Sequence, residues 1–262
     1  MKPLLVWLAA AWLGASSVAC AQDRPGTVLV TGSNRGLGLE LAKQYAAAGW
    51  RVIATARDPG NAAELSALAA ADADVAIEPL DVRDVAAIRA LAEKYSGQPI
   101  DVLVANAGVL GDLPAQTLGA LDYAVFEEVM AVNVFGALAV AEAFRDNVAS
   151  STQRTIVAIT SRSGIISQPG YRGPYFYRAS KIALNMSMRV LADDLRERGV
   201  IVALVSPPPT DTDMLRQLIG PENAARQAEP SEVIARVIEL IGRLTSADSG
   251  QVLYYDGSTL PW

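Results

Sequence analysis

The 262-residue chain contains no histidine and only one cysteine. Without an imidazole, a Ser-His-Asp or Cys-His nucleophilic site, a His-ligated metal and a His general base are all excluded. A single cysteine cannot form an intramolecular disulfide or a multi-thiolate zinc or iron–sulfur site, so no metal is expected. Acid–base chemistry in this chain therefore falls to Asp, Glu, Lys or Tyr.

Positive charge is also scarce, because 22 Lys and Arg residues stand against 28 Asp and Glu, a formal net charge of −6. A protein that binds a phosphate backbone would carry a basic patch or stripe, so no nucleic acid partner is expected. Hydrophobic residues make up 51% of the chain and charged residues 19%, which is typical of a well-buried globular protein. The length fits one large α/β domain.

Residues 1–21 are predicted to be a signal peptide. The positive charge of Lys2 precedes the ten-residue apolar run Leu4–Leu13, and Ala19 and Ala21 form a small-residue cleavage site. The apolar run is too short to span a bilayer comfortably. We therefore expect an exported mature domain of residues 22–262, in the periplasm or secreted.

Two alternatives keep the chain at a membrane, and a third keeps it inside the cell. Cys20 could be lipidated, because Val18-Ala19-Cys20 partly resembles a lipobox, or the segment could stay uncleaved as an anchor. If the start is misread, the protein is cytosolic. No second long apolar span is expected in the rest of the chain.

From Thr27 onward, short β-branched or apolar runs alternate with longer helical patterns, which is typical of βαβ units. Runs such as Val102–Ala105 are apolar on successive residues, as in a sheet covered on both faces. The sequence predicts one doubly wound, Rossmann-type α/β domain with a parallel sheet of seven strands: Thr27–Thr31, Arg51–Thr55, Val75–Leu80, Asp101–Asn106, Arg154–Ser161, Val200–Ser206 and Gln251–Tyr254.

Helical spacing is found between these strands, at Leu37–Ala48, Ala62–Ala71, Asp84–Tyr95, Asp122–Asn147, Tyr177–Arg198 and Ser231–Leu244, with a cap region expected at Ser231. The polar stretch Asp211–Pro230 is long for a connection in this fold, so we interpret it as a lid.

The first strand is followed by a glycine-rich turn, Gly32-Ser33-Asn34-Arg35-Gly36-Leu37-Gly38, which opens a helix. Glycines allow a tight turn and a close backbone approach to a pyrophosphate, while the helix N-terminus presents amides to the anion. The sequence thus predicts a dinucleotide site here.

Later strand ends add to this site. Arg57 follows the second strand, where an NAD-preferring protein would usually carry an acid, and Arg57 and Arg35 both suit the 2′-phosphate of NADP. Solvated loop arginines are the alternative interpretation. Asp81-Val82 follows the third strand, where a carboxylate can accept from an adenine amino group, and Asn106-Ala107-Gly108 follows the fourth.

Tyr177 and Lys181 are four residues apart and share one helix face. A free tyrosine titrates near pH ~10. A neighbouring cation stabilises the phenolate and lowers the pKa of the phenol, so that it can exchange a proton closer to neutral pH. In a chain without histidine, this pair is the best available general acid–base.

With these motifs together, the sequence resembles the short-chain dehydrogenase/reductase family over Thr27–Trp262. The resemblance rests on Thr31-Gly32-x-x-x-Gly36-x-Gly38, Asp81, Asn106-Ala107-Gly108, Asn133, Ser161 and Tyr177-x-x-x-Lys181, in the family's order and spacing. It is strongest toward the C-factor-like carbonyl reductase branch, through Ile159–Gly164, Tyr175–Met186, the ending Asp256–Trp262, and an apparent insertion at Tyr171–Pro174.

The resemblance implies roles for individual residues. Tyr177 is the general acid–base, and Lys181 binds the nicotinamide ribose and lowers the Tyr177 pKa. Ser161 holds the substrate carbonyl, and Ser163 is the alternative candidate for that role. Asn133 holds a water in the proton relay. Pro207 and Thr212 belong to the cofactor loop, where Pro208 replaces the family's usual glycine.

The expected function is hydride transfer between NADP(H) and a small-molecule carbonyl or secondary alcohol. NAD(H) is the less favoured cofactor. The alternative is a dinucleotide-binding signalling or scaffolding protein without significant turnover. The substrate pocket is expected from Val109–Gln116, Ser163–Tyr175 and Asp211–Arg226. The oligomeric state is left open between a homodimer and a homotetramer. The resemblance implies that the helices Asp122–Asn147 and Tyr177–Arg198 would form the subunit interfaces, as they commonly do in the family.

Export gives the first testable prediction. Mass spectrometry of the protein from its native cell should find the N-terminus at Gln22, because signal peptidase cleaves after small residues such as Ala19 and Ala21. An intact Met1 on cytosolic protein would contradict export, and a diacylated Cys20 would replace cleavage at Gln22 with lipoprotein processing.

Overall fold

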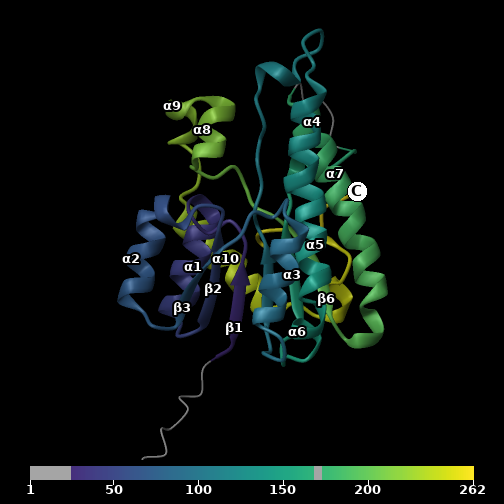
Figure 1. Cartoon of the computed structure of the whole chain (residues 1–262). Helices are drawn as coiled ribbons and strands as arrows, with labels where there is room; N and C mark the ends of the chain where they lie inside the picture. The colour runs from purple at the N-terminus through teal and green to yellow at the C-terminus, as the bar shows by residue number, and fades with distance from the viewer. Residues whose placement is uncertain (1–24, 168–172) are drawn as a thin grey trace, which may run out of the picture.

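The computed structural model describes residues 25–167 and 173–262 (Figure 1). The predicted signal peptide, residues 1–21, lies outside the described residues, as do Tyr171 and Arg172 of the apparent insertion. One layer of parallel strands lies between two layers of helices.

The sheet confirms the predicted architecture. In the described part of the chain it has seven parallel strands, β1 (Thr27–Val30), β2 (Arg51–Ala56), β3 (Val75–Pro79), β4 (Val102–Ala105), β5 (Thr155–Ile159), β6 (Ile201–Ser206) and β7 (Val252–Tyr254). Their spatial order is β3-β2-β1-β4-β5-β6-β7. The chain winds outward from β1 to β3 and then returns to β4 on the other side, so a crevice opens at the carboxyl ends of β1 and β4.

The helices are α1 (Gly36–Ala47), α2 (Ala63–Ala71), α3 (Val85–Lys94), α4 (Tyr123–Met130), α5 (Ala137–Ala143), α6 (Arg145–Ala149), α7 (Tyr175–Asp194), α8 (Asp213–Ile219), α9 (Pro221–Ala224) and α10 (Pro230–Arg243). Short turns of 3₁₀ helix are η1 (Pro59–Asn61), η2 (Pro114–Gln116), η4 (Arg162–Gly164), η5 (Arg196–Arg198) and η6 (Ser246–Asp248). A π-helical turn, η3 (Ala131–Gly136), joins α4 to α5.

Alternating strand residues supply two separate cores. Leu29, Leu103 and Ile156 face α3, α5 and α7, whereas Val28 and Val104 face α1, α2 and α10. Both sets are fully buried, which explains why the strands are apolar on successive residues rather than on every second one.

Two predicted helices differ in detail. Asp122–Asn147 is not one helix, because the π-helical turn η3 interrupts it at Asn133 and α6 starts separately after Phe144. The last helix begins at Pro230 with Glu229 at its N-cap, so Ser231 lies inside the helix and is not the cap. Proline suits the first helical position because its missing N–H has no partner there.

The polar stretch Asp211–Pro230 contains regular structure. It forms α8 and α9, which stand above the carboxyl ends of the strands on the α1 side of the crevice (Figure 1). Helices this short show little hydrophobic periodicity, so they could not be predicted from the sequence pattern.

The segment Tyr123–Ala143 is long and apolar enough to span a membrane by length and composition, with a mean hydropathy of 1.7. The expectation that no second long apolar span follows the N-terminus is therefore wrong by that measure. In the folded chain its inner residues, including Val129 and Val140, are fully buried against the protein. The segment thus packs one side against the core, with 44% of its apolar 18-residue window buried.

Candidate active site

The glycine-rich turn connects β1 to the N-terminus of α1. Gly36, the first residue of α1, has a φ of 56°, a left-handed conformation that glycine adopts without strain. Among the described residues, a Cβ added there would meet only Thr212, at an ordinary contact distance of 3.6 Å, so the backbone here is not tightly packed. A Cβ at Gly38 would lie 2.2 Å from the carbonyl oxygen of Gly32, so α1 packs tightly on the turn. The result is a cradle of backbone N–H groups that suits a phosphate.

Hydrogen bonds brace this turn against neighbouring strand ends. The backbone N–H of Ser33 donates to Thr55 O at 2.8 Å. Asn106 Nδ2 donates to Thr31 O at 2.9 Å, and the Thr31 hydroxyl accepts from the N–H groups of Asn106 and Ala107, both at 3.0 Å. The predicted Asn-Ala-Gly motif therefore lies directly beside the glycine-rich turn.

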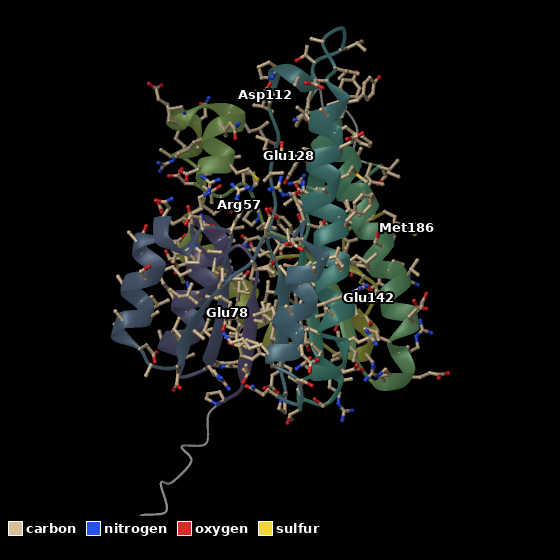
Figure 2. All side chains as sticks on the ribbon, viewed as in Figure 1. Arg57, Glu78, Asp112, Glu128, Glu142 and Met186 are labelled. Carbon is tan, nitrogen blue, oxygen red and sulfur yellow. The ribbon has the colours of Figure 1, made fainter. Side chains whose placement is uncertain are left out.

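Three arginines lie in the segments that follow β1, β2 and β3. Arg35 forms an exposed ion pair with Asp213 of α8, at 3.3 Å. Arg57 is exposed beneath α8 and α9 (Figure 2). Arg83 binds the carboxylate of Asp81 through Nε and Nη2, at distances from 2.6 to 3.1 Å, and this hydrogen bonding holds the pKa of Asp81 below its ordinary value.

The remaining predicted cofactor residues occupy the same edge. Asn34 is exposed, Leu37 and Pro207 are half-buried, and Val82 is buried. All follow strand ends β1, β3 and β6, so the structure brings the predicted cofactor residues to one side of the sheet.

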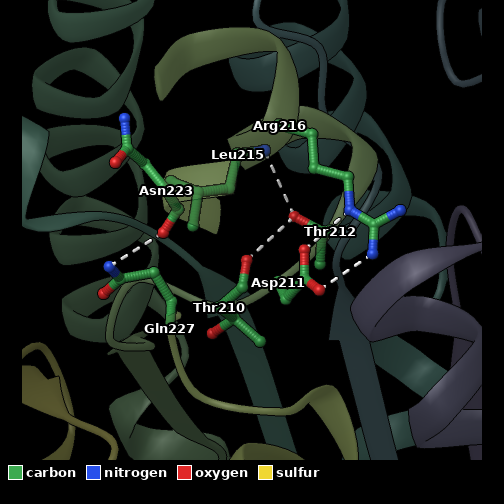
Figure 3. A network of polar contacts seen from close by, with 7 residues as sticks. All are labelled: Thr210, Asp211, Thr212, Leu215, Arg216, Asn223 and Gln227. Carbon is green, nitrogen blue, oxygen red and sulfur yellow. Dashed lines mark hydrogen bonds and ion pairs between the residues drawn. The ribbon is translucent and has the colours of Figure 1, made fainter. Parts of the chain in front are cut away.

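Above this edge, a polar network organises the start of the segment Asp211–Pro230, which the sequence predicted as a lid (Figure 3). The Thr212 hydroxyl accepts from Leu215 N–H and donates to Thr210 O, both at 3.3 Å, and thereby caps α8. The Arg216 guanidinium binds the Asp211 carboxylate at 2.7 and 2.8 Å and lowers the pKa of that carboxyl. Thr212 is thus engaged as a helix cap beside Gly36.

Tyr177 and Lys181 lie on the buried face of α7, with exposed fractions of 9% and 5%. The Tyr177 side chain is hydrogen-bonded to Ser161, the residue that follows β5 and starts η4. Burial raises the pKa of the Tyr177 phenol, and the hydrogen bond with Ser161 opposes this rise without cancelling it. The phenol is therefore protonated at neutral pH.

The lowering of the Tyr177 pKa by Lys181, which the family resemblance implies, stays a prediction, and the Lys181 ammonium is held by other contacts. Its Nζ donates to the carbonyl oxygen of Ile159 at 2.9 Å and lies 5.7 Å from the centroid of the Tyr177 ring. Burial lowers the pKa of Lys181 to about 8. Desolvation is thus the largest cause of the pKa shift of both residues, because burial removes the water that would stabilise each charged form.

Of the two candidate serines, Ser161 is the one in contact with Tyr177. Its Oγ also accepts from the backbone N–H of Ser163, at 3.1 Å. Ser163 lies within the turn η4 and contributes that backbone amide to the position of Ser161.

Asn133 is buried in the π-helical turn η3, and its side chain is occupied by other contacts. Its Oδ1 accepts from Val109 N–H at 2.8 Å, and its Nδ2 donates to Val109 O at 2.9 Å and Ser180 Oγ at 3.0 Å. A Cβ added at Gly108 would lie 3.3 Å from Asn133 Oδ1 and 3.9 Å from Lys181 Nζ. Asn133 is therefore close to the lysine, but its side chain positions a loop.

Two residues of this site, Arg83 and Ser180, were given no role by sequence reasoning, and a third, Gln116, was predicted only as the end of the pocket segment Val109–Gln116. Arg83 follows Asp81 by two residues, a spacing that could have suggested an ion pair. Ser180 lies inside the Tyr-x-x-x-Lys segment and accepts from Asn133. Gln116 reaches the same helix from a distant turn, and no local pattern marks it.

A hollow of about 550 Å³ lies elsewhere, between α3 and the α5–α6 region. It is lined by Arg89, Glu93 and Arg145, none of which contacts the tyrosine, the serine or the lysine described above. We locate the site by its chemistry rather than by this groove.

Comparison with known proteins agrees with this geometry. The family model described as short chain dehydrogenase matches residues 26–223. The chain therefore belongs to the short-chain dehydrogenase/reductase family, a family of oxidoreductases.

Two curated relatives and one solved structure illustrate the range of similarity. C-signal of Myxococcus xanthus is 34% identical over 175 residues, 67% of this chain and 100% of that protein. The 1-hydroxy-2-glutathionyl-2-methyl-3-butene dehydrogenase of Rhodococcus sp. (strain AD45) is 32% identical over 239 residues, 90% of this chain and 99% of that protein. NADPH-bound carbonyl reductase from chicken fatty liver superposes with a TM-score of 0.82 at 30% identity, covering 91% of this chain and 100% of its own.

Burial of Lys181 leads to a prediction about stability. The folded pKa of about 8 lies below the unfolded value of about 10.4, so the charged ammonium opposes folding fully below pH 8, and this cost vanishes above both values. Lys181→Met should therefore stabilise the cofactor-free protein at pH 7 by about 1–3 kcal/mol, after subtraction of one lost hydrogen bond.

Urea denaturation at pH 7 measures this change. Lys43→Met, which removes a partly exposed lysine paired with Glu64, is the matched control and should change stability by less than about 0.5 kcal/mol. A loss of stability in Lys181→Met would contradict the argument.

Proposed function

We propose that this protein is an NADP(H)-dependent oxidoreductase that reduces a carbonyl compound or oxidises the corresponding secondary alcohol. The observation that carries the proposal is the buried Tyr177 phenol, hydrogen-bonded to Ser161 and one helical turn from Lys181. These groups lie at the carboxyl edge of the sheet that also holds the glycine-rich turn. A dinucleotide-binding role alone does not call for a paired phenol and hydroxyl.

The chain fits a dinucleotide. The cradle at Gly36 and the N-terminus of α1 would hold the pyrophosphate, and Asp81 would accept from the adenine amino group. Lys181 would bind the nicotinamide ribose, and the Pro207–Thr212 loop would close over the nicotinamide. When bound, NADPH supplies the hydride.

Tyr177 supplies the proton in this proposal. Because burial raises the pKa of its phenol, the group is protonated at neutral pH and suits donation to a carbonyl oxygen that gains negative charge. Ser161, hydrogen-bonded to the same phenol, would orient that oxygen. This protonation state favours the reductive direction.

The proton lost by Tyr177 must be replaced. Lys181 Nζ, with a pKa of about 8, is acidic enough to exchange protons near neutral pH. Since the Asn133 side chain is committed to Val109 and Ser180, any relay water at this residue would bind its backbone carbonyl in the π-helical turn.

The arginines favour NADP(H) over NAD(H). Arg57 directly follows β2 and Arg35 lies in the glycine-rich turn, and the last residue of β2, Ala56, is not an acid. Solved neighbours with bound NADPH or NADP are consistent with this preference. Arg83, already paired with Asp81, adds positive charge to the same edge.

A second candidate is a dinucleotide-binding signalling or scaffolding protein without significant turnover. It is favoured by the similarity to C-signal and by the predicted export of the chain, away from the cytosolic NADPH pool. Fluorescence titration with NADPH, followed by NADPH oxidation with aldehydes, ketones and quinones, separates the two. Binding without oxidation would favour the second candidate.

Two further proposals concern location and assembly. We retain export of residues 22–262 as the proposed localisation. Exposed apolar side chains at Phe135, Met186 and Val190, on η3 and α7, support a homodimer or homotetramer through these helices.

The cofactor preference is tested by Arg57→Ala. A charge-assisted contact to phosphate is worth about 1.5–3 kcal/mol, so NADPH affinity should fall roughly 10- to 100-fold while NADH affinity changes little. Arg89→Ala, an exposed arginine in the distant groove beside α3, is the control and should leave both affinities unchanged. Equal losses for both cofactors, or tighter NADH binding by the wild type, would remove the assignment.

The proton donor is tested by Tyr177→Phe. The substitution keeps the ring and its packing but removes the hydroxyl, and general acid–base catalysis typically contributes about 10²–10⁴-fold, so kcat should fall by at least that range. NADPH affinity should change little. Tyr45→Phe, at another buried tyrosine, is the control and should turn over normally. Normal turnover by Tyr177→Phe, on a substrate that the wild type reduces well, would overturn the mechanism.

A further inference from the structure

Gln116 is a buried glutamine, with an exposed fraction of 2%, at the end of the short turn η2. Its side-chain amide makes four hydrogen bonds, all to backbone groups. Two of the bonds reach the helix that carries Tyr177, 61 residues further along the chain. A buried amide with this many backbone partners joins the segments that it contacts.

The acceptor side of the amide caps α7. Gln116 Oε1 accepts from the backbone N–H groups of Phe176 and Tyr177, both at 3.0 Å. These N–H groups lie in the first turn of a helix, where no intrahelical acceptor exists. The N-cap residue itself, Pro174, makes no side-chain cap, so the cap comes from Gln116.

The donor side of the amide holds the loop after β4. Gln116 Nε2 donates to Leu110 O at 2.9 Å and to Asp112 O at 3.1 Å. Between them, a Cβ added at Gly111 would lie 3.0 Å from the same Nε2 and 2.7 Å from Val129. This loop is one predicted wall of the substrate pocket, and it packs tightly against the amide.

The backbone of Tyr177 is held from its other end as well. Its carbonyl oxygen accepts from the hydroxyl of Ser180 at 2.7 Å, and Ser180 in turn accepts from Asn133. Asn133 binds both backbone groups of Val109, the first residue of the loop that Gln116 holds. Two side-chain amides thus connect one loop to the N–H and the C=O of Tyr177.

We propose that Gln116 is a positioning residue for Tyr177, fixing the first turn of α7 against the Val109–Gln116 loop so that the phenol meets a bound carbonyl. This inference rests on the proposed function. Displacement of a reacting group by about 1 Å can cost on the order of 10²-fold in rate, so loss of this cap is expected to act on turnover.

The closing experiment begins with Gln116→Met, which keeps the size and the unbranched shape of the side chain but removes the acceptor and the donors. With enzyme concentration normalised to NADPH-binding sites, kcat should fall about 10- to 100-fold, and NADPH affinity should stay within about twofold of the wild type. Steady-state kinetics at a temperature where the variant is fully folded gives both values.

Gln116→Glu separates the two sides of the amide. Its carboxylate keeps the acceptor for Phe176 and Tyr177, and negative charge is favourable at a helix N-terminus. It loses both donors and repels the carbonyl oxygens of Leu110 and Asp112. It should therefore restore kcat to within about threefold of the wild type while raising KM.

Asn147→Leu is the matched control. Asn147 is another buried amide that donates to two backbone carbonyls, those of Tyr95 and Gln98, at the opposite end of the sheet. It should lower stability but leave kcat per NADPH-binding site unchanged. A normal kcat in Gln116→Met, or equal kcat losses in the methionine and glutamate variants, would overturn the inference.

Amide hydrogen exchange keeps this test independent of turnover. Exchange of the Phe176 and Tyr177 amides should accelerate in Gln116→Met and not in Asn147→Leu. A wild type that binds NADPH but reduces nothing would overturn the proposed function, and unchanged exchange at these two amides would overturn the cap.

Discussion

Helices cover both faces of the sheet, so the polar side chains of a functional site can gather only beyond the ends of the strands. Val28 and Leu29, neighbours on β1, are both fully buried on opposite faces, and the same holds for Val102 and Leu103 on β4. The strand order reverses between these two strands, and that is where the glycine-rich turn and Asn106 meet. The position of the site thus follows from the covering of the sheet and the reversal of its winding.

The buried lysine shows how the site differs from the rest of the protein. The other two lysines of the described chain, Lys43 and Lys94, keep their ammonium groups in contact with water while they pair with Glu64 and Glu78. Lys181 is instead buried, and its ammonium donates to the backbone carbonyl oxygen of Ile159. Burying this ammonium costs solvation free energy. Such a cost is typical of a functional site, because strongly perturbed pKa values cluster at active sites.

Much of this could be predicted from the sequence because it follows from local patterns. Strand and helix periodicity specified seven strands and the faces of the long helices, and fixed spacing placed Gly36, Tyr177 and Lys181. The π-helical turn at Asn133 has no hydrophobic period of its own, so it was read as part of one long helix. Gln116 was predicted as part of the pocket segment, but its bond to α7 could not be, because that bond depends on a turn and a helix that meet only in three dimensions.

The segment Tyr123–Ala143 has a consequence for any route that takes the chain across a membrane unfolded. During such passage the segment is exposed before the sheet that covers it has formed, and its hydropathy alone would allow it to leave sideways into lipid. Glu127 and Glu128 lie near its N-terminal end, where a charged residue opposes insertion by less than the about 2.5–3.5 kcal/mol that it costs at the centre of a spanning helix. The two carboxylates that keep one face of α4 in water thus also favour complete passage of the chain.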